Sequence, residues 1–205
     1  ILCLITSTIS AAGLEEGRAT SAAVFGNPGC LTEIDGVAVQ ASVGRPFGVG
    51  GLYTGESTVS FPMGKNVLGA GVHFLKMDSI YQEGVLGATV ARTFKSFGFG
   101  ITGRLFYASA GPDFDHGVAP ALDVGTAYQV AHGMAVALVA ANLFTTSLYE
   151  NLSAPPPLLS MGLRFSKIRD FNTALEIEYE KGFPATLIFG QEIQLVKGLN
   201  IHAGL

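Results

Sequence analysis

Residues 97–108 read FGFGITGRLFYA, and the alternation within this stretch decides the fold class. Large apolar side chains occupy most odd positions. The even positions are small or polar at Gly98, Gly100, Thr102 and Arg104, with Phe106 as an exception. Because successive side chains of a β-strand point to opposite faces, the stretch predicts a strand with one apolar face and one small or polar face.

The same period-2 alternation recurs along the chain from Val37 onward. The small or polar positions of three further repeats are Gly69, Gly71 and His73, then Asp123, Gly125 and Gln129, then Glu176, Glu178 and Glu180. Soluble sheets carry interspersed Lys and Glu on their polar face. Small side chains instead suit the crowded interior of a barrel whose apolar face meets lipid.

The overall composition also favours a membrane protein. Of the 205 residues, 14% are charged, against roughly 25% in soluble domains, and mean hydropathy is +0.41. A membrane-spanning helix needs about 20 consecutive apolar residues, and no such run follows the N-terminus. The longest candidate, residues 134–144, is interrupted by Asn142. Only a closed barrel then satisfies the backbone in lipid, so we predict an all-β, antiparallel, up-and-down transmembrane β-barrel.

The alternation and its breaks predict about eleven strands. These are residues 37–44, 57–63, 66–76, 83–94, 97–108, 119–130, 134–143, 158–167, 172–180, 185–195 and 199–205. Bacterial single-chain barrels have even strand numbers. We therefore expect a truncated C-terminus and at least one further closing strand.

The connections between these strands alternate in length. Tight turns are expected at residues 64–65, 95–96, 131–133, 168–171 and 196–198, and longer loops at 77–82, 109–118, 144–157 and 181–184. Short turns on one side and longer loops on the other are typical of outer-membrane barrels. The hairpins predict that Phe94 faces Phe97, Val130 faces Met134 and Leu195 faces Leu199, with Gly133 and Gly198 in left-handed turn positions.

The first residues have a different character. The segment ILCLITSTISAAG resembles the apolar core and cleavage site of a secretory signal peptide, with cleavage near Ala11 or Ala12. A buried N-terminal strand is the alternative, since short apolar runs are ambiguous. The usual Met and basic region are missing, so we expect the sequence to begin inside its reading frame. Residues 1–12 are thus interpreted as a signal-peptide remnant, and export is the consequence.

Several short motifs resemble one family of outer-membrane proteins. Residues 17–31, GRATSAAVFGNPGCL, are similar to an Ala/Gly-rich stretch leading into Asn-Pro-Ala-Gly-Leu, which marks the FadL/PorV family, although Cys30 stands where Ala or Gly is usual. Further similar pieces are residues 58–64, 121–128, 141–143, 190–192 and 201–205. The similarity extends over nearly the whole chain.

This resemblance implies an architecture and a function. Family members include the long-chain fatty-acid channel FadL and the PorV-type barrels of the type IX secretion system, which are 14-stranded barrels whose N-terminal segment enters the lumen. The resemblance implies that residues 13–36 form a plug-like segment carrying the motif Asn27, Pro28 and Gly29. Residues 37–205 would then be barrel strands, with about three strands absent. From the residues alone, Asn27-Pro28-Gly29 indicates only a turn.

Few residues suggest chemistry. Glu176, Glu178 and Glu180 place three carboxylates on one strand face, which indicates a cation site or paired acids. If Ile168 pairs with Asn172, Arg164 lies opposite Glu176, and an internal ion pair explains the pattern better. The four histidines, His73, His116, His132 and His202, are too dispersed to predict a metal site. Asp113, Asp115 and His116 are expected in a solvated loop, with Ca²⁺ binding as the alternative.

We therefore expect a non-enzymatic protein of the bacterial outer membrane without cofactor or metal. The candidate residues of the lumen or ligand site are His73, Arg104, Asp123, Arg164, Glu176, Glu178 and Glu180. The expected function is passive transport of hydrophobic small molecules, with outer-membrane lipid, a hydrophobic ligand or secretion-machinery proteins as partners. The alternatives are a non-transporting accessory barrel of a secretion system and a soluble β-sandwich binding module. A net charge of −4, with scattered Lys and Arg, argues against nucleic acid.

Overall fold

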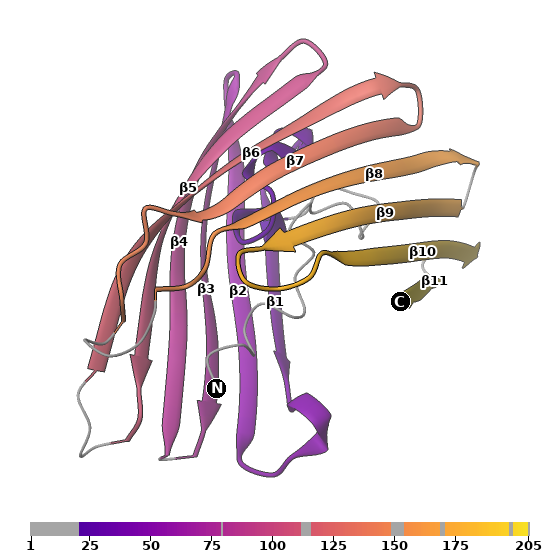
Figure 1. Ribbon diagram of the computed structural model, residues 1–205. Coiled ribbons are helices and arrows are strands. Elements are labelled where there is room, and N and C mark those ends of the chain that lie inside the picture. The colour runs from indigo at the N-terminus through magenta and orange to yellow at the C-terminus, as the bar shows by residue number, and fades with distance from the viewer. Residues whose placement is uncertain are drawn as a thin grey trace.

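The computed structural model describes residues 21–78, 80–111, 116–148, 154–168, 171–196 and 199–204. Its described strands form a single antiparallel sheet of eleven strands in which each strand pairs with its neighbours in sequence (Figure 1). The strands are β1 Ala38–Gly44, β2 Leu52–Met63, β3 Asn66–Met77, β4 Tyr81–Phe94, β5 Phe97–Ser109, β6 His116–Ala131, β7 Met134–Leu143, β8 Leu158–Ile168, β9 Phe171–Glu180, β10 Thr186–Val196 and β11 Leu199–Gly204. The prediction of an all-β, antiparallel, up-and-down arrangement is confirmed.

The sheet is strongly curved but open (Figure 1). Within the described part of the chain, the first strand, β1, and the last, β11, do not pair with each other. All eleven strands nevertheless belong to one sheet and not to the two stacked sheets of a β-sandwich. Closure into a barrel stays a prediction.

In the described ranges, only 3₁₀ helices accompany the strands: η1 Ser21–Val24, η2 Pro28–Glu33 and η3 Pro46–Gly48. No helix in the described ranges is long and apolar enough to cross a membrane. The predicted signal-peptide residues 1–12 and the first part of the expected plug, residues 13–20, lie outside the described residues.

The alternation that predicted the strands matches their two faces. We call the side of the sheet that contacts residues 21–36 the inward face and the other side the outward face. Inward side chains are buried, with Thr102, Asp123 and Ser160 at 0% exposure. Outward side chains are large, apolar and exposed, as Leu86 at 55% and Met161 at 52% show. The sheet therefore hides its polar side and presents its apolar side.

Strand pairing corrects several predicted boundaries. β2 begins at Leu52, because residues 52–56 pair with residues 73–77 of β3 although LYTGE does not alternate cleanly. The connection from β3 to β4 shortens to residues 78–80, with Met77 opposite Tyr81. Asp78 adopts φ 41° in this tight connection. Cross-strand hydrogen bonds thus extend strands into residues whose side chains do not alternate between apolar and polar.

Two predicted hairpin registers are wrong, and one is correct. Phe94 faces Phe97, with Lys95 at φ 58° in the two-residue turn. Ala131, not Val130, faces Met134, because the register shifts between Gln129 and Ala131. Gly133 still takes the left-handed conformation expected of it, with φ 75°.

A similar shift changes the last hairpin. Val196, not Leu195, faces Leu199, and the register shifts between Gln194 and Val196. Gly198 lies outside the described residues. A bulge adds one residue to one strand of a pair, so it moves every facing residue beyond it by one position.

The register between β4 and β5 can be tested by cross-linking on the outward face. Val90 and Ile101 face each other, so Val90→Cys with Ile101→Cys should form a disulfide in most molecules under mild oxidation. Ala91→Cys with Ile101→Cys should not, because Ala91 points inward. Non-reducing electrophoresis and peptide mapping would distinguish the two. Equal cross-linking of both pairs would contradict the register.

Candidate functional site

The candidate site is the N-terminal segment, residues 21–36, which lies against the inward face of the sheet. Asn27 begins its second 3₁₀ helix: the Asn27 side-chain Oδ1 accepts a hydrogen bond of 2.8 Å from the Gly29 backbone N–H. Pro28 follows at the first helical position, where its missing N–H removes no helical bond. Pro28, Gly29, Cys30 and Leu31 are all buried. The sequence thus folds locally into a tight turn whose apolar residues face the sheet.

A row of glycines on β3, β4, β5 and β6 makes this close packing possible. The inward glycines that approach the N-terminal segment are Gly69, Gly71, Gly87, Gly98, Gly100 and Gly125. A Cβ added to Gly69 would lie 2.7 Å from Val24 Cγ2, and one added to Gly100 would lie 2.5 Å from the Pro28 carbonyl carbon. Real Cβ atoms do not approach other atoms so closely. The small inward positions of the alternating pattern are therefore the surface that receives the segment.

Gly29 of the N-terminal segment makes an equally close contact with the sheet. A Cβ added to Gly29 would lie 2.6 Å from the Cα of Thr126 on β6. Gly29, Gly98 and Gly100 therefore allow main chain to lie directly on main chain, a known reason for Gly within strands. The motif Asn27, Pro28 and Gly29 lies at the centre of this contact.

The Asn27 side chain attaches the segment to two strands at once. Its Nδ2 donates to the carbonyl oxygens of Thr126, at 3.1 Å, and of Leu138, at 3.3 Å. Thr126 and Leu138 are register partners on β6 and β7. Asn27 is 0% exposed, and a buried amide is costly unless its donors and acceptors are used. Here both ends of the amide have partners.

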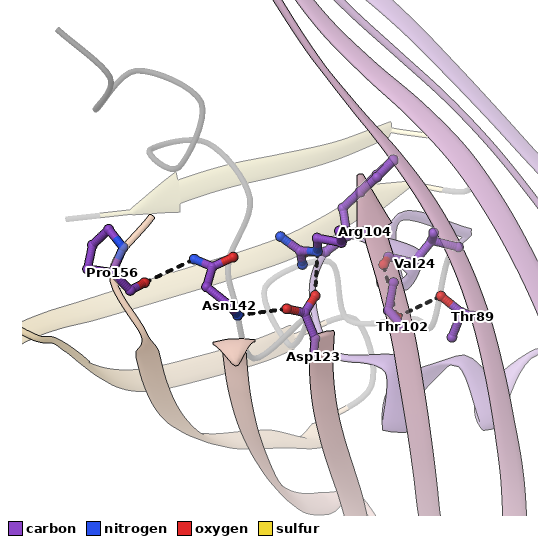
Figure 2. A network of polar contacts seen from close by, with 8 residues as sticks. Val24, Thr89, Thr102, Arg104, Asp123, Asn142 and Pro156 are labelled. Carbon is purple, nitrogen blue, oxygen red and sulfur yellow. Dashed lines mark hydrogen bonds and ion pairs between the residues drawn. The ribbon is translucent and has the colours of Figure 1, made fainter. Parts of the chain in front are cut away.

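Arg104 and Asp123 form the polar centre of the inward face (Figure 2). The Arg104 guanidinium is ion-paired with the Asp123 carboxylate and also donates to the Phe25 carbonyl oxygen of the N-terminal segment. The side chains of Arg104 and Asp123 are 13% and 0% exposed. Because a buried charge needs a partner, the ion pair and the carbonyl together allow Arg104 to remain inside.

The network continues from Asp123 toward the long connection after β7 (Figure 2). Asp123 Oδ1 accepts from the Asn142 backbone N–H at 2.9 Å, and Asn142 Nδ2 donates to the Pro156 carbonyl oxygen at 3.1 Å. Asn142 has φ 57°, a left-handed conformation that Asn tolerates better than most residues. One chain of contacts therefore joins the segment, β5, β6 and residues 154–157.

A second attachment uses neutral hydroxyls. Thr102 on β5 shares a hydrogen bond of 2.7 Å with Thr89 on β4 and donates to the Val24 carbonyl oxygen at 3.3 Å (Figure 2). Thr89 and Thr102 are register partners, so the bond joins the two strands as well. Val24 and Phe25 thus each have a carbonyl held by an inward side chain of β5.

Arg164 forms a different ion pair from the one predicted. Ile168 faces Phe171 and not Asn172, and the register shifts by one more residue between Phe165 and Ile168. Arg164 therefore lies opposite Ala174, and Glu176 lies opposite Gly162. The predicted facing of Arg164 and Glu176 is therefore wrong.

Arg164 instead pairs with Glu33 of the N-terminal segment, with 3.0 Å between Nη2 and Oε2. Glu176, which is buried, accepts a hydrogen bond from Ser160. The inward side chains of Arg104 and Arg164 thus both contact the N-terminal segment.

The apolar side of the segment forms the core of the molecule. Its buried members are Ala23, Val24, Phe25, Cys30, Leu31 and Ile34, which pack with inward residues including Val85, Ala91, Ala127, Ala137 and Ala174. Burial, followed by the negative charge of Glu33, raises the pKa of the Cys30 thiol to about 12. Arg164 acts in the opposite direction, and Glu176 adds to the increase. Cys30 is therefore a protonated core residue at neutral pH.

The other predicted residues lie elsewhere on the inward face. His73 is on β3, with Nε2 at 3.3 Å from Thr54 Oγ1. Glu178 and Glu180 are half-buried on β9. Asp113 and Asp115 are outside the described residues, and the ring of His116 lies 6.3 Å from that of Tyr107. Within the described ranges, no group of three His, Cys, Asp or Glu side chains could hold a metal ion.

Several residues of the candidate site were not identified from the sequence. Glu33, Thr102 and Asn142 contact the segment or its network, yet none of them was predicted to be a site residue. The inward glycines were interpreted only as small residues of a crowded interior. The regular recurrence of glycine on four consecutive strands was the one signal that could have located the docking surface.

No protein-family model matches the chain. No curated protein sequence matches it either.

Packing of the segment can be tested on one strand, β5. Gly100→Ala should lower the free energy of unfolding by about 1–3 kcal/mol, because its Cβ would overlap Pro28. Gly103→Ala is the matched control, since nothing lies within 4 Å of its Cβ. The control should change stability by no more than about 0.5 kcal/mol. Denaturant unfolding followed by circular dichroism measures both, and equal effects would contradict the docking.

The Cys30 thiol reports on the same packing through pH. Its raised pKa means that the folded protein keeps a proton which the unfolded chain loses near its ordinary pKa of 9.0. Stability from this group is therefore present below about pH 9 and declines as pH rises toward 12. Near pH 9, alkylation of Cys30 in the native protein should be on the order of a hundredfold slower than after unfolding. Peptide mapping measures the rate, and fast native alkylation would disprove the burial.

Proposed function

We propose that the protein is an outer-membrane β-barrel of the FadL/PorV type, located in the bacterial outer membrane, that passively transports hydrophobic small molecules. The observation that carries the proposal is the segregation of the two faces. Exposed outward side chains on successive strands include Phe61, Val72, Phe74, Leu86, Val90, Ile101, Leu105, Leu138, Met161 and Ile177. A continuous apolar outer surface of this kind is stable against lipid and unfavourable in water.

Closure of the sheet is part of the proposal. An open edge exposes backbone N–H and C=O groups, and each such group in hydrocarbon costs several kcal/mol. Strands β1 and β11 have such edges in the described part of the chain. The strong curvature of the sheet favours closure, with further strands pairing between β11 and β1 (Figure 1).

The position of the N-terminal segment supports transport. The segment occupies the inward face as a plug would, through apolar packing and four side-chain attachments at Asn27, Thr102, Arg104 and Arg164. Apolar residues line this region together with the segment. An apolar lining suits hydrophobic cargo, because desolvated polar molecules would lose their hydrogen bonds to water there.

The barrel can be tested by heat-modifiability on a semi-native gel of the full-length mature protein extracted from outer membranes with detergent. The unheated sample should migrate faster than the boiled one and resist SDS, because a closed barrel keeps its compact shape. A single unshifted band from protein that is soluble in buffer would overturn the membrane proposal.

Transport needs its own measurement. Gram-negative cells that produce the full-length protein should accumulate the uncharged hydrophobic dye Nile red several-fold faster than cells with an empty vector. Leu105→Arg places a charge on the outward face at a cost of about 2–4 kcal/mol at mid-membrane, so it should reduce both the heat-modifiable band and uptake. A heat-modifiable barrel without faster uptake would favour the accessory role in a secretion system.

A further inference from the structure

A second polar cluster lies on the inward face, on β2, β3 and β4. In register, His73 on β3 faces Glu56 on β2 and Val85 on β4. Glu83 stands two positions from Val85 and therefore shares its face, as does Tyr81, whose hydroxyl donates to Glu83 Oε2 at 2.5 Å. His73 is thus flanked by a carboxylate on each neighbouring strand.

The hydrogen bonds of Thr54 determine which nitrogen of the uncharged His73 ring carries the hydrogen. The Thr54 hydroxyl donates its only hydrogen to the Phe74 carbonyl oxygen at 3.1 Å. The contact of 3.3 Å between Thr54 Oγ1 and His73 Nε2 must then have the imidazole as donor. In the uncharged ring, Nδ1 is consequently an acceptor.

This acceptor is buried and unused within the described structure. His73 is 7% exposed, and its Nδ1 has no hydrogen-bond partner among the described residues. A buried polar atom without a partner destabilises the folded state, because it has lost its hydrogen bond to water. The cluster therefore combines an unsatisfied lone pair with two carboxylates, and all three groups are complementary to a hydrogen-bond donor.

The cluster lies directly beside the N-terminal segment. Gly71, two positions before His73 on β3, packs against the ring of Phe25, and Gly87 on β4 packs against the same ring. His73 and Glu83 continue from these glycines toward the connection of residues 78–80. A molecule that moves along β3 and β4 from that end would meet the cluster before it meets Phe25.

The charged side chains of the inward face are mostly carboxylates. Inward carboxylates on the described strands are Glu56, Glu83, Asp123, Glu176, Glu178 and Glu180, and Glu33 adds one from the segment. The inward guanidiniums among described side chains of β1–β9 are those of Arg104 and Arg164. An anionic head group would therefore enter a region with an excess of negative charge, whereas a cation would be attracted.

We propose that His73, Glu56 and Glu83 bind the ammonium group of a hydrophobic amine, so that the protein selects alkylammonium cargo over carboxylates of the same chain length. An ammonium has three N–H donors for the three acceptors, and a carboxylate has none. This inference rests on the proposed transport function, because it assigns the chemical class of the cargo.

The test compares three twelve-carbon probes on the purified, detergent-solubilised full-length protein: dodecylammonium, dodecanoate and uncharged dodecanol. Equilibrium dialysis of radiolabelled probes should give dodecylammonium at least about a tenfold lower Kd than dodecanoate. Glu83→Gln and His73→Phe should each weaken dodecylammonium binding by about tenfold and leave dodecanol within about twofold. Dodecanol binding thus verifies that each variant is folded.

Asp78→Asn is the matched charge control. Asp78 is exposed in the connection between the same two strands, and Asn tolerates its positive φ. This variant should leave all three affinities unchanged. Equal or tighter binding of dodecanoate, or an equal response of Glu83→Gln and Asp78→Asn, would overturn the cargo assignment and leave the transport proposal intact. Failure of the native protein to bind even dodecanol would overturn both.

Discussion

Close contact between the N-terminal segment and the glycines of β3 to β6 is the constraint on which the rest of the structure depends. Glycine in a strand sacrifices side-chain packing and costs roughly 0.5–1 kcal/mol relative to Ala. Here that cost is offset because Val24, Phe25 and Leu31 fill the space that side chains would occupy. The sheet and the segment are therefore complementary halves of one core: without the segment, the inward face would lack most of its apolar contacts.

The polar contacts follow from this placement. Once the segment covers the inward face, every polar group beneath it is removed from water and needs a partner. Arg104 satisfies both Asp123 and the Phe25 carbonyl, and Asn27 satisfies two strand carbonyls. Each of these side chains holds the segment and is held by it. Release of the segment would have to break buried, charge-assisted contacts, so the segment is a fixed part of the resting structure.

The sequence predicted the strands well and the contacts between them less well. Alternation depends only on neighbouring residues, so stretches such as residues 97–108 located their strands and identified their buried face. Register depends on a single turn: a shift near Gln129 displaced the partner of Met134, and the pairing of Ile168 with Phe171 separated Arg164 from Glu176. The partner of Gly29 lies 97 residues away, at Thr126, and no local pattern could reveal it.

The same arrangement determines the electrostatics of the interior. The inward guanidiniums of Arg104 and Arg164 both bind the N-terminal segment, Arg104 through the Phe25 carbonyl and Arg164 through Glu33. A molecule that passes beside the segment therefore meets carboxylates without the compensating attraction of a mobile arginine or lysine on the described inward strands. Docking of the segment and discrimination by charge are thus physically linked. A segment anchored only by apolar packing would leave the guanidiniums more available to anionic molecules and weaken the preference of the interior for cations.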